Sequence, residues 1–154
     1  MTHNILKKRK MRNNIFVITL ITVIGFASCA KEATTTIPQA SAKPEGTFTA
    51  TKTGSFVAAP GEPAAGTAQI GTDTKSTQFV KFGSDFKSNF STGAVTVIMS
   101  KTANYESASG QVVSLVSVNG EQFFKVTPSV SSEFKYVILW CSAARVPFGS
   151  AELK

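Results

Sequence analysis

The residue in this sequence best suited to chemistry is Cys141, which ends the apolar run from Tyr136. A thiol can act as a redox group or a soft metal ligand, and it can equally pack in a core as a small hydrophobic side chain. Arg145 and Lys135 are the only nearby cations that would lower its pKa, whereas apolar neighbours would raise it. A cysteine in an oxidising compartment needs either burial or use, and the residues alone leave both alternatives open.

Other catalytic constellations are scarce. The single histidine, His3, lies in the N-terminal segment, so a mature chain without that segment has no Ser–His or Cys–His nucleophile and no imidazole ligand. Five carboxylates in the domain could in principle form a catalytic pair, but nothing in the sequence brings two of them together. They are Asp73, Asp85, Glu106, Glu121 and Glu133. A carboxylate hydrolase is therefore only a third alternative.

The N-terminus has the layout of a secretory signal: a basic stretch up to Arg12, an apolar stretch from Ile15 to Phe26, then small residues. Its end, Phe26-Ala27-Ser28-Cys29, resembles the lipobox of bacterial lipoproteins. We therefore predict a signal peptide over residues 1–28 and a lipid on Cys29, with ordinary cleavage after Ala30 as the alternative. Each buried methylene contributes about 0.8 kcal/mol, so several acyl chains would hold the protein on a membrane. The predicted location is the bacterial cell envelope, at the outer membrane, facing the periplasm or the surface.

The net charge of +7 comes largely from that signal. Without its five basic residues, 11 basic residues face 9 acidic ones, a balance of +2 that gives no electrostatic reason to expect a nucleic-acid partner. Residues 29–45 are rich in Thr, Ala, Ser, Lys and Pro, which predicts a flexible tether reaching up to roughly 50 Å from the membrane.

Residues 46–154 alternate short β-type stretches with turns, which predicts one all-β domain, an antiparallel β-sandwich or barrel. The stretch from Glu133 to Cys141 predicts a central strand buried on both faces at its C-terminal end. We expect Phe86 and Phe90 to plug one end of the core. Asn119-Gly120 predicts a two-residue hairpin between the neighbouring strands.

Several of these stretches together are similar to the DM-thirteen domain, an electron-transfer domain family that also accompanies DOMON domains in extracellular proteins. The most specific part is Trp140-Cys141 followed by Val146-Pro147-Phe148-Gly149. Further matches are Gly54-Ser55-Phe56, Gly66-Thr67-Ala68, the segment from Phe79 to Phe86, and the strand from Val95 to Ser100. Ala144 departs from the family pattern, where an aromatic residue is common, and Ser91-Thr92-Gly93 replaces a Pro-Asp type turn.

The resemblance implies a redox role for Cys141, as a thiol or as the ligand of a prosthetic group such as haem, with an unknown redox or protein partner. For a haem, Cys141 would be the natural axial ligand and Met99 a second one. Copper(I) held by the same two sulfurs is the weaker variant. The main alternative is a non-catalytic binding or scaffold module at the cell surface in which Cys141 is core packing.

Overall fold

The computed structural model describes residues 41–104 and 110–154. The predicted signal peptide, the lipid site at Cys29 and most of the predicted tether lie outside the described residues. Among the described residues there is no helix, and ten strands account for the regular structure. They are β1 Thr49–Ala58, β2 Ala64–Ala65, β3 Thr67–Thr72, β4 Gln78–Phe82, β5 Lys87–Ser88, β6 Val95–Ser100, β7 Gly110–Val116, β8 Gln122–Lys125, β9 Tyr136–Cys141 and β10 Val146–Glu152.

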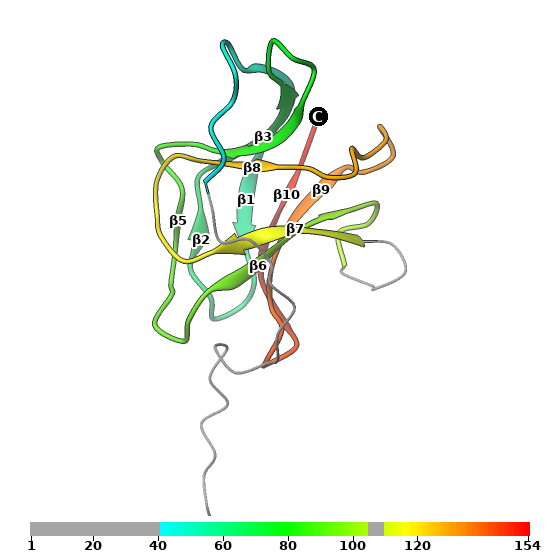
Figure 1. The fold of residues 1–154 in the computed structure, drawn as a ribbon. Helices are drawn as coiled ribbons and strands as arrows, with labels where there is room; N and C mark the ends of the chain where they lie inside the picture. The colour runs from blue at the N-terminus through cyan, green and yellow to red at the C-terminus, as the bar shows by residue number, and fades with distance from the viewer. Residues whose placement is uncertain (1–40, 105–109) are drawn as a thin grey trace, which may run out of the picture.

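Eight of these strands form one antiparallel sheet in the order β7-β6-β9-β10-β1-β3-β4-β8, and β2 pairs with β5 in a small second sheet. The large sheet curls until its two end strands, β7 and β8, come close, so the domain is nearly closed into a barrel (Figure 1). The prediction of a single all-β, barrel-like domain is confirmed. Curling lets one face of every strand contribute to the same interior.

The predicted central strand is β9, which pairs with β6 on one side and β10 on the other. Val137, Leu139 and Cys141 point into the main core. Ile138 points to the opposite face, where it is also fully buried opposite Ile98 of β6. Both faces are therefore buried in the middle of the strand, at Val137, Ile138 and Leu139, whereas Trp140 near its C-terminal end is only partly buried. The predicted burial of that end is confirmed for the core face and not for the opposite face.

Phenylalanine rings fill the interior. The rings of Phe82 and Phe86 lie 4.4 Å apart between centroids, and Phe56 meets them at 5.2 and 5.4 Å. Phe124 packs edge-on against Phe82 at 5.0 Å. Edge-to-face and tilted contacts of this kind add to the hydrophobic stabilisation. The predicted role of Phe86 is confirmed, and Phe90, partly buried, packs against the same core.

The hairpin predicted at Asn119-Gly120 is wrong. β7 and β8 lie at opposite ends of the sheet and pair with β6 and β4, not with each other. The turn is instead hydrogen-bonded to the segment around β5. Ser88 N–H donates to Asn119 Oδ1 at 2.7 Å, and Gly120 N–H donates to the Phe86 carbonyl at 3.0 Å. Gly120 has φ of 91°, a conformation that suits glycine.

The sequence predicts two short strands on either side of Gly54, at residues 47–51 and 55–58. The structure instead has one strand of ten residues, β1. Gly54 lies in the ladder with β3, and a Cβ there would fall 2.1 Å from the carbonyl oxygen of Glu152. Glycine is therefore required because the C-terminal segment crosses directly over it, and the chain does not turn at this point.

The segment Ser41–Phe48, here called the strap, lies across the outer face of the β3-β4-β8 edge. Ala42 N–H donates to the Phe123 carbonyl at 2.7 Å, and Glu45 N–H donates to Asp73 Oδ2 at 3.0 Å. The predicted boundary between tether and domain at residue 45 is therefore too late, since residues from Ser41 onward are bonded to the domain. Their polar, Pro-containing composition gave no sign of this.

Candidate functional site

Cys141 ends β9 inside the barrel with 1 % of its surface exposed. Val146 lies opposite it on β10. The sulfur is disulfide-bonded, and no described cysteine is a free thiol. The structure therefore does not present Cys141 as the exposed thiol that a direct electron-transfer role would use.

The predicted lipid on Cys29 and an intrachain disulfide exclude each other, because the sequence has only two cysteines. A thioether to the lipid consumes the Cys29 sulfur, and Cys29 lies outside the described residues. In a lipidated chain, a disulfide at Cys141 would need a cysteine from another molecule.

The second predicted cofactor ligand, Met99, is fully buried on β6. It lies opposite Val137 in the β6–β9 ladder, whereas Cys141 is four residues further along β9. At about 3.3 Å per residue this separates the two positions by roughly 13 Å. Two sulfur ligands of one ion, each bonded at about 2.3 Å, cannot be more than about 5 Å apart. The structure does not bring Cys141 and Met99 together.

Glu106, one of the five carboxylates, is outside the described residues. No group of three or more His, Cys, Asp or Glu side chains suitable for a metal occurs in the described part of the chain. Glu133 pairs with Lys101 at 2.6 Å and Glu121 with Lys81 at 2.9 Å. Each of these acids thus has a separate structural partner.

Two aspartates hold turns. Burial acts to raise the pKa of Asp73, but hydrogen bonds from the backbone N–H groups of Glu45, Thr77 and Lys75 outweigh it and the pKa is lowered. The pKa of Asp85 is lowered mainly by the hydroxyl of Thr67, which donates to Oδ2 at 2.8 Å. Both carboxylates stay ionised as acceptors, which suits structural capping and not proton transfer.

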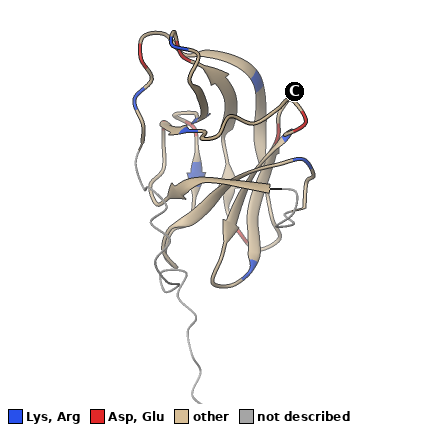
Figure 2. Ribbon diagram, turned by 45° about the vertical axis from the view of Figure 1, so that its right-hand side comes forward, with Lys and Arg blue, Asp and Glu red and all other residues tan. Residues whose placement is uncertain are grey.

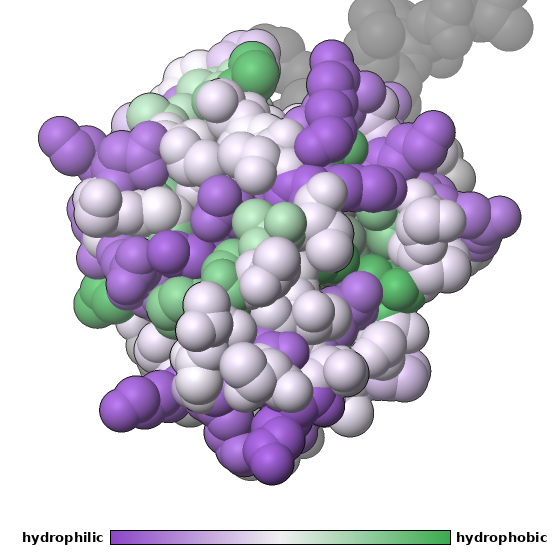
Figure 3. Space-filling model, turned by 90° about the horizontal axis from the view of Figure 1, so that it is seen from above, coloured by the Kyte–Doolittle hydropathy of each residue, from purple (hydrophilic) through white to green (hydrophobic). Residues whose placement is uncertain are grey.

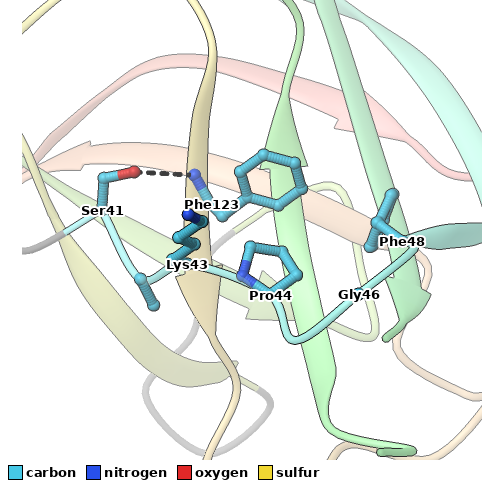
Figure 4. A pocket seen from close by; sticks show the side chains of 7 residues that line it. Ser41, Lys43, Pro44, Gly46, Phe48 and Phe123 are labelled. Atoms are coloured by element: carbon cyan, nitrogen blue, oxygen red, sulfur yellow. Dashed lines mark hydrogen bonds between the residues drawn. The ribbon is translucent and has the colours of Figure 1, made fainter. Parts of the chain in front are cut away.

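The structure places a different group of residues at a surface hollow of about 330 Å³. The strap forms one side of it and β8 the other (Figure 4). Three rings converge there, those of Pro44, Phe48 and Phe123, together with the side chains of Ser41 and Lys43. We call this the strap hollow.

The aromatic wall of the strap hollow depends on the register of the sheet. Phe123 lies opposite Lys81 in the β4–β8 ladder, on the outer face, and Phe48 meets its ring edge-on at 5.4 Å. Phe79 supports Phe123 from β4 with ring centroids 6.4 Å apart. Gly71 makes room for Phe48, since a Cβ there would fall 2.8 Å from the tip of that ring.

A positive charge lies beside these rings. Lys81 Nζ is 5.1 Å from the centroid of Phe123 and 6.0 Å from that of Phe48, and it also pairs with Glu121. Its side chain is 22 % exposed. A cation over a ring is attracted by the negative face of the π system, so Lys81 fixes Phe123 in place. The charge of Lys43, which lines the hollow and is exposed, has no salt-bridge partner among the described residues.

A second hollow of about 250 Å³ lies near Val130 and Phe134. Its polar groups bind the chain itself: the Gln78 amide accepts from Val130 N–H and donates to its carbonyl, and Lys52 donates to the Ser132 carbonyl at 2.9 Å. These groups are already occupied by structural hydrogen bonds. The strap hollow is the better candidate site.

Sequence reasoning missed Lys43, Phe48, Lys81 and Phe123 as a site. Phe48 and Phe123 looked like ordinary strand residues, and they are 75 residues apart in sequence. The one local signal was Lys81 between Phe79 and Phe82, a cation in an otherwise aromatic strand. Only the β3-β4-β8 pairing brings these residues together.

Charges of both signs are distributed over strands and loops without a single-sign stripe in the described part (Figure 2). Viewed from above, apolar atoms form small separate spots among polar ones (Figure 3). Within residues 41–104 and 110–154, no helix has the length and apolar character needed to cross a membrane.

No family model matches this chain, and no match was found among curated proteins or among solved structures. The DM-thirteen resemblance therefore remains a prediction that rests on the quoted motifs.

Proposed function

We propose that this protein is a module of the bacterial cell envelope with a DM-thirteen-like β domain that acts by binding rather than by catalysis, and that it is held on the membrane by a lipid in chains whose Cys29 carries the lipid and not a disulfide. The observation that supports binding is the strap hollow, where aromatic rings and an exposed lysine line an opening on the surface. Apolar walls with a few polar groups are the usual composition of ligand sites.

The sites considered for catalysis give less support. The Cys141 sulfur is enclosed, Met99 is about four strand residues away, and the described carboxylates serve as caps or ion-pair partners. A residue walled in by side chains cannot meet an electron donor directly.

A redox role for Cys141 is the second candidate, and its disulfide state favours it. Reduction of a disulfide takes up two electrons and two protons and yields two thiols, so such a bond can in principle cycle. This candidate requires a local opening of the domain that exposes the buried Cys141 sulfur to a redox partner.

An absorption spectrum tests whether the Cys141 sulfur carries a cofactor, which is one form of the redox candidate. The full protein is measured as isolated and after addition of haem or copper(I), alongside the Cys141→Ser variant. The binding proposal expects no visible band in the protein as isolated, no shift of the haem or copper(I) spectrum relative to the free cofactor after addition, and no difference between the two proteins. A visible band that is present in the wild type and lost in Cys141→Ser would establish a cofactor on the sulfur and overturn the proposal.

A thiol–disulfide titration completes the comparison. The protein is equilibrated with glutathione buffers, and the thiols are trapped with an alkylating reagent and counted by mass. A single cooperative transition near the thiol–disulfide reduction potential of the cell envelope would support the redox candidate. A disulfide that resists reduction until the protein unfolds would support a structural role.

A further inference from the structure

We propose that the strap hollow binds a single aromatic ring carrying a short carboxylate arm. The proposal rests on the binding function above and specifies its ligand. Such a group occurs in free aryl alkanoic acids and at the C-terminus of peptides that end in Phe.

The size of the hollow sets the size of the ligand. An apolar cavity of about 150 Å³ accommodates benzene, so about 330 Å³ has room for one ring and a short substituent. Ligand pockets for drug-sized molecules begin at about 300 Å³, which places this hollow at the small end of the range.

The walls favour a ring. Phe48 and Phe123 meet at an interplanar angle of 77°, and Pro44 adds a further apolar surface from the strap. Neither phenylalanine has a polar tip, so both offer only ring faces and edges. A third ring can continue this edge-to-face arrangement, which is favoured over the contact of a flexible aliphatic chain.

The polar groups favour an anion. The Ser41 hydroxyl oxygen accepts from Phe123 N–H at 3.3 Å, so its own O–H can donate to a ligand. Lys43 contributes a positive charge on the same side of the hollow. A hydroxyl and an ammonium together supply the donors for one carboxylate, and a cationic ligand would meet no acceptor of comparable strength in the lining.

The test follows backbone amide signals of the isotope-labelled full chain by NMR during titration with 3-phenylpropionate. For a ligand of this size we expect a dissociation constant of about 1 mM, with the largest shifts in residues 41–48 and at Phe123. Acetate, which lacks the ring, should leave these signals unchanged at the same concentration, and phenethylamine, which keeps the ring but carries the opposite charge, should bind at least about threefold more weakly than 3-phenylpropionate.

Two variants and a matched control define the contacts. Lys43→Gln should weaken binding about threefold, the magnitude of one exposed charge interaction. Phe123→Leu, which keeps an apolar side chain, should weaken it roughly three- to tenfold through loss of the ring contact. The control is Lys125→Gln, which removes a lysine of β8, the strand of Phe123, that does not line the hollow. This variant should bind the ligand like the wild type.

The peptide source is distinguished by Gly-Gly-Gly-Phe with a free C-terminus and its C-terminal amide. Binding of the free acid peptide but not of the amide assigns the site to peptide ends, and binding of phenylpropionate alone assigns it to small acids. The inference is overturned if no amide of residues 41–48 shifts at about 10 mM probe, ten times the expected constant, or if phenethylamine binds as tightly as 3-phenylpropionate. Neither result changes the outcome of the absorption spectrum or of the thiol–disulfide titration, which test the Cys141 sulfur and not the strap hollow.

Discussion

Replacing Cys141 by Ser and by Ala distinguishes packing from chemical use. Both variants are compared with the wild type in the presence of reductant, so that no protein contains a disulfide. Ser is the closer replacement in shape, but it places a hydroxyl where the sulfur is 1 % exposed among apolar core residues. Ala removes the sulfur without adding a polar group.

The expected order follows from these environments. A buried hydroxyl without a partner costs about 1–3 kcal/mol, whereas the loss of a sulfur-sized apolar group costs about 1 kcal/mol. For a domain of this size, each kcal/mol lowers the melting temperature by roughly 4 °C or more. Cys141→Ser should therefore melt about 4–12 °C below the wild type and Cys141→Ala about 4 °C below it.

The measurement is thermal unfolding followed by circular dichroism. The wild type is also labelled with maleimide in its native state, after reduction and removal of the reductant. We expect labelling only after denaturant is added. Rapid labelling of the folded protein, or a Cys141→Ser variant as stable as the wild type, would show that the sulfur is not enclosed in the core. The preference for binding over redox function would then lose its basis.

Three further predictions test other parts of the structure. Gly54→Ala should destabilise the domain by about 3 kcal/mol or more, because the added Cβ would overlap the Glu152 carbonyl. Gly120→Ala is the control: no atom lies within 4 Å of its Cβ, so only the left-handed backbone should cost stability, about 1–2 kcal/mol. Chemical denaturation measures both free energies of unfolding. Asp85 has a lowered pKa, so its contribution to stability is present above the ordinary value of about 3.9 and is lost as pH falls through the lower folded pKa. In Asp85→Asn, the free energy of unfolding should therefore fall less steeply with decreasing pH in this acid range. Equal slopes in both proteins would contradict the assignment. If Cys29 carries the lipid, Cys29→Ala should move the protein from the membrane to the soluble fraction and remove the mass of the acyl chains, and an unchanged distribution would contradict lipid anchoring.

The strands could be predicted because their signals are local. β4, β6 and β9 fall on stretches rich in β-branched and aromatic residues, and the apolar run ending at Cys141 correctly indicated a central strand. Alternation and composition act over a few residues, so they survive in any topology.

Pairing partners could not be predicted in the same way. Asn119-Gly120 has the composition of a hairpin turn, but the barrel places β7 and β8 at its two ends, and the turn is satisfied by contacts with Phe86 and Ser88. Gly54 resembled a break between strands because the carbonyl of Glu152 that excludes a side chain there comes from the far end of the chain. The strap hollow was missed for the same reason.

The strap connects the proposed anchor with the proposed site. Ser41 and Ala42 are hydrogen-bonded to Phe123, so the chain reaches the domain at the rim of the hollow. Eleven residues, and so twelve Cα–Cα steps, separate Cys29 from Ser41, and a fully extended chain of that length spans at most about 43 Å. If Cys29 carries the lipid, the rim of the hollow is held within this distance of the membrane surface. A ligand of the strap hollow must then be available in that layer, which favours small acids of the envelope and peptide ends displayed near the membrane over partners that remain further away.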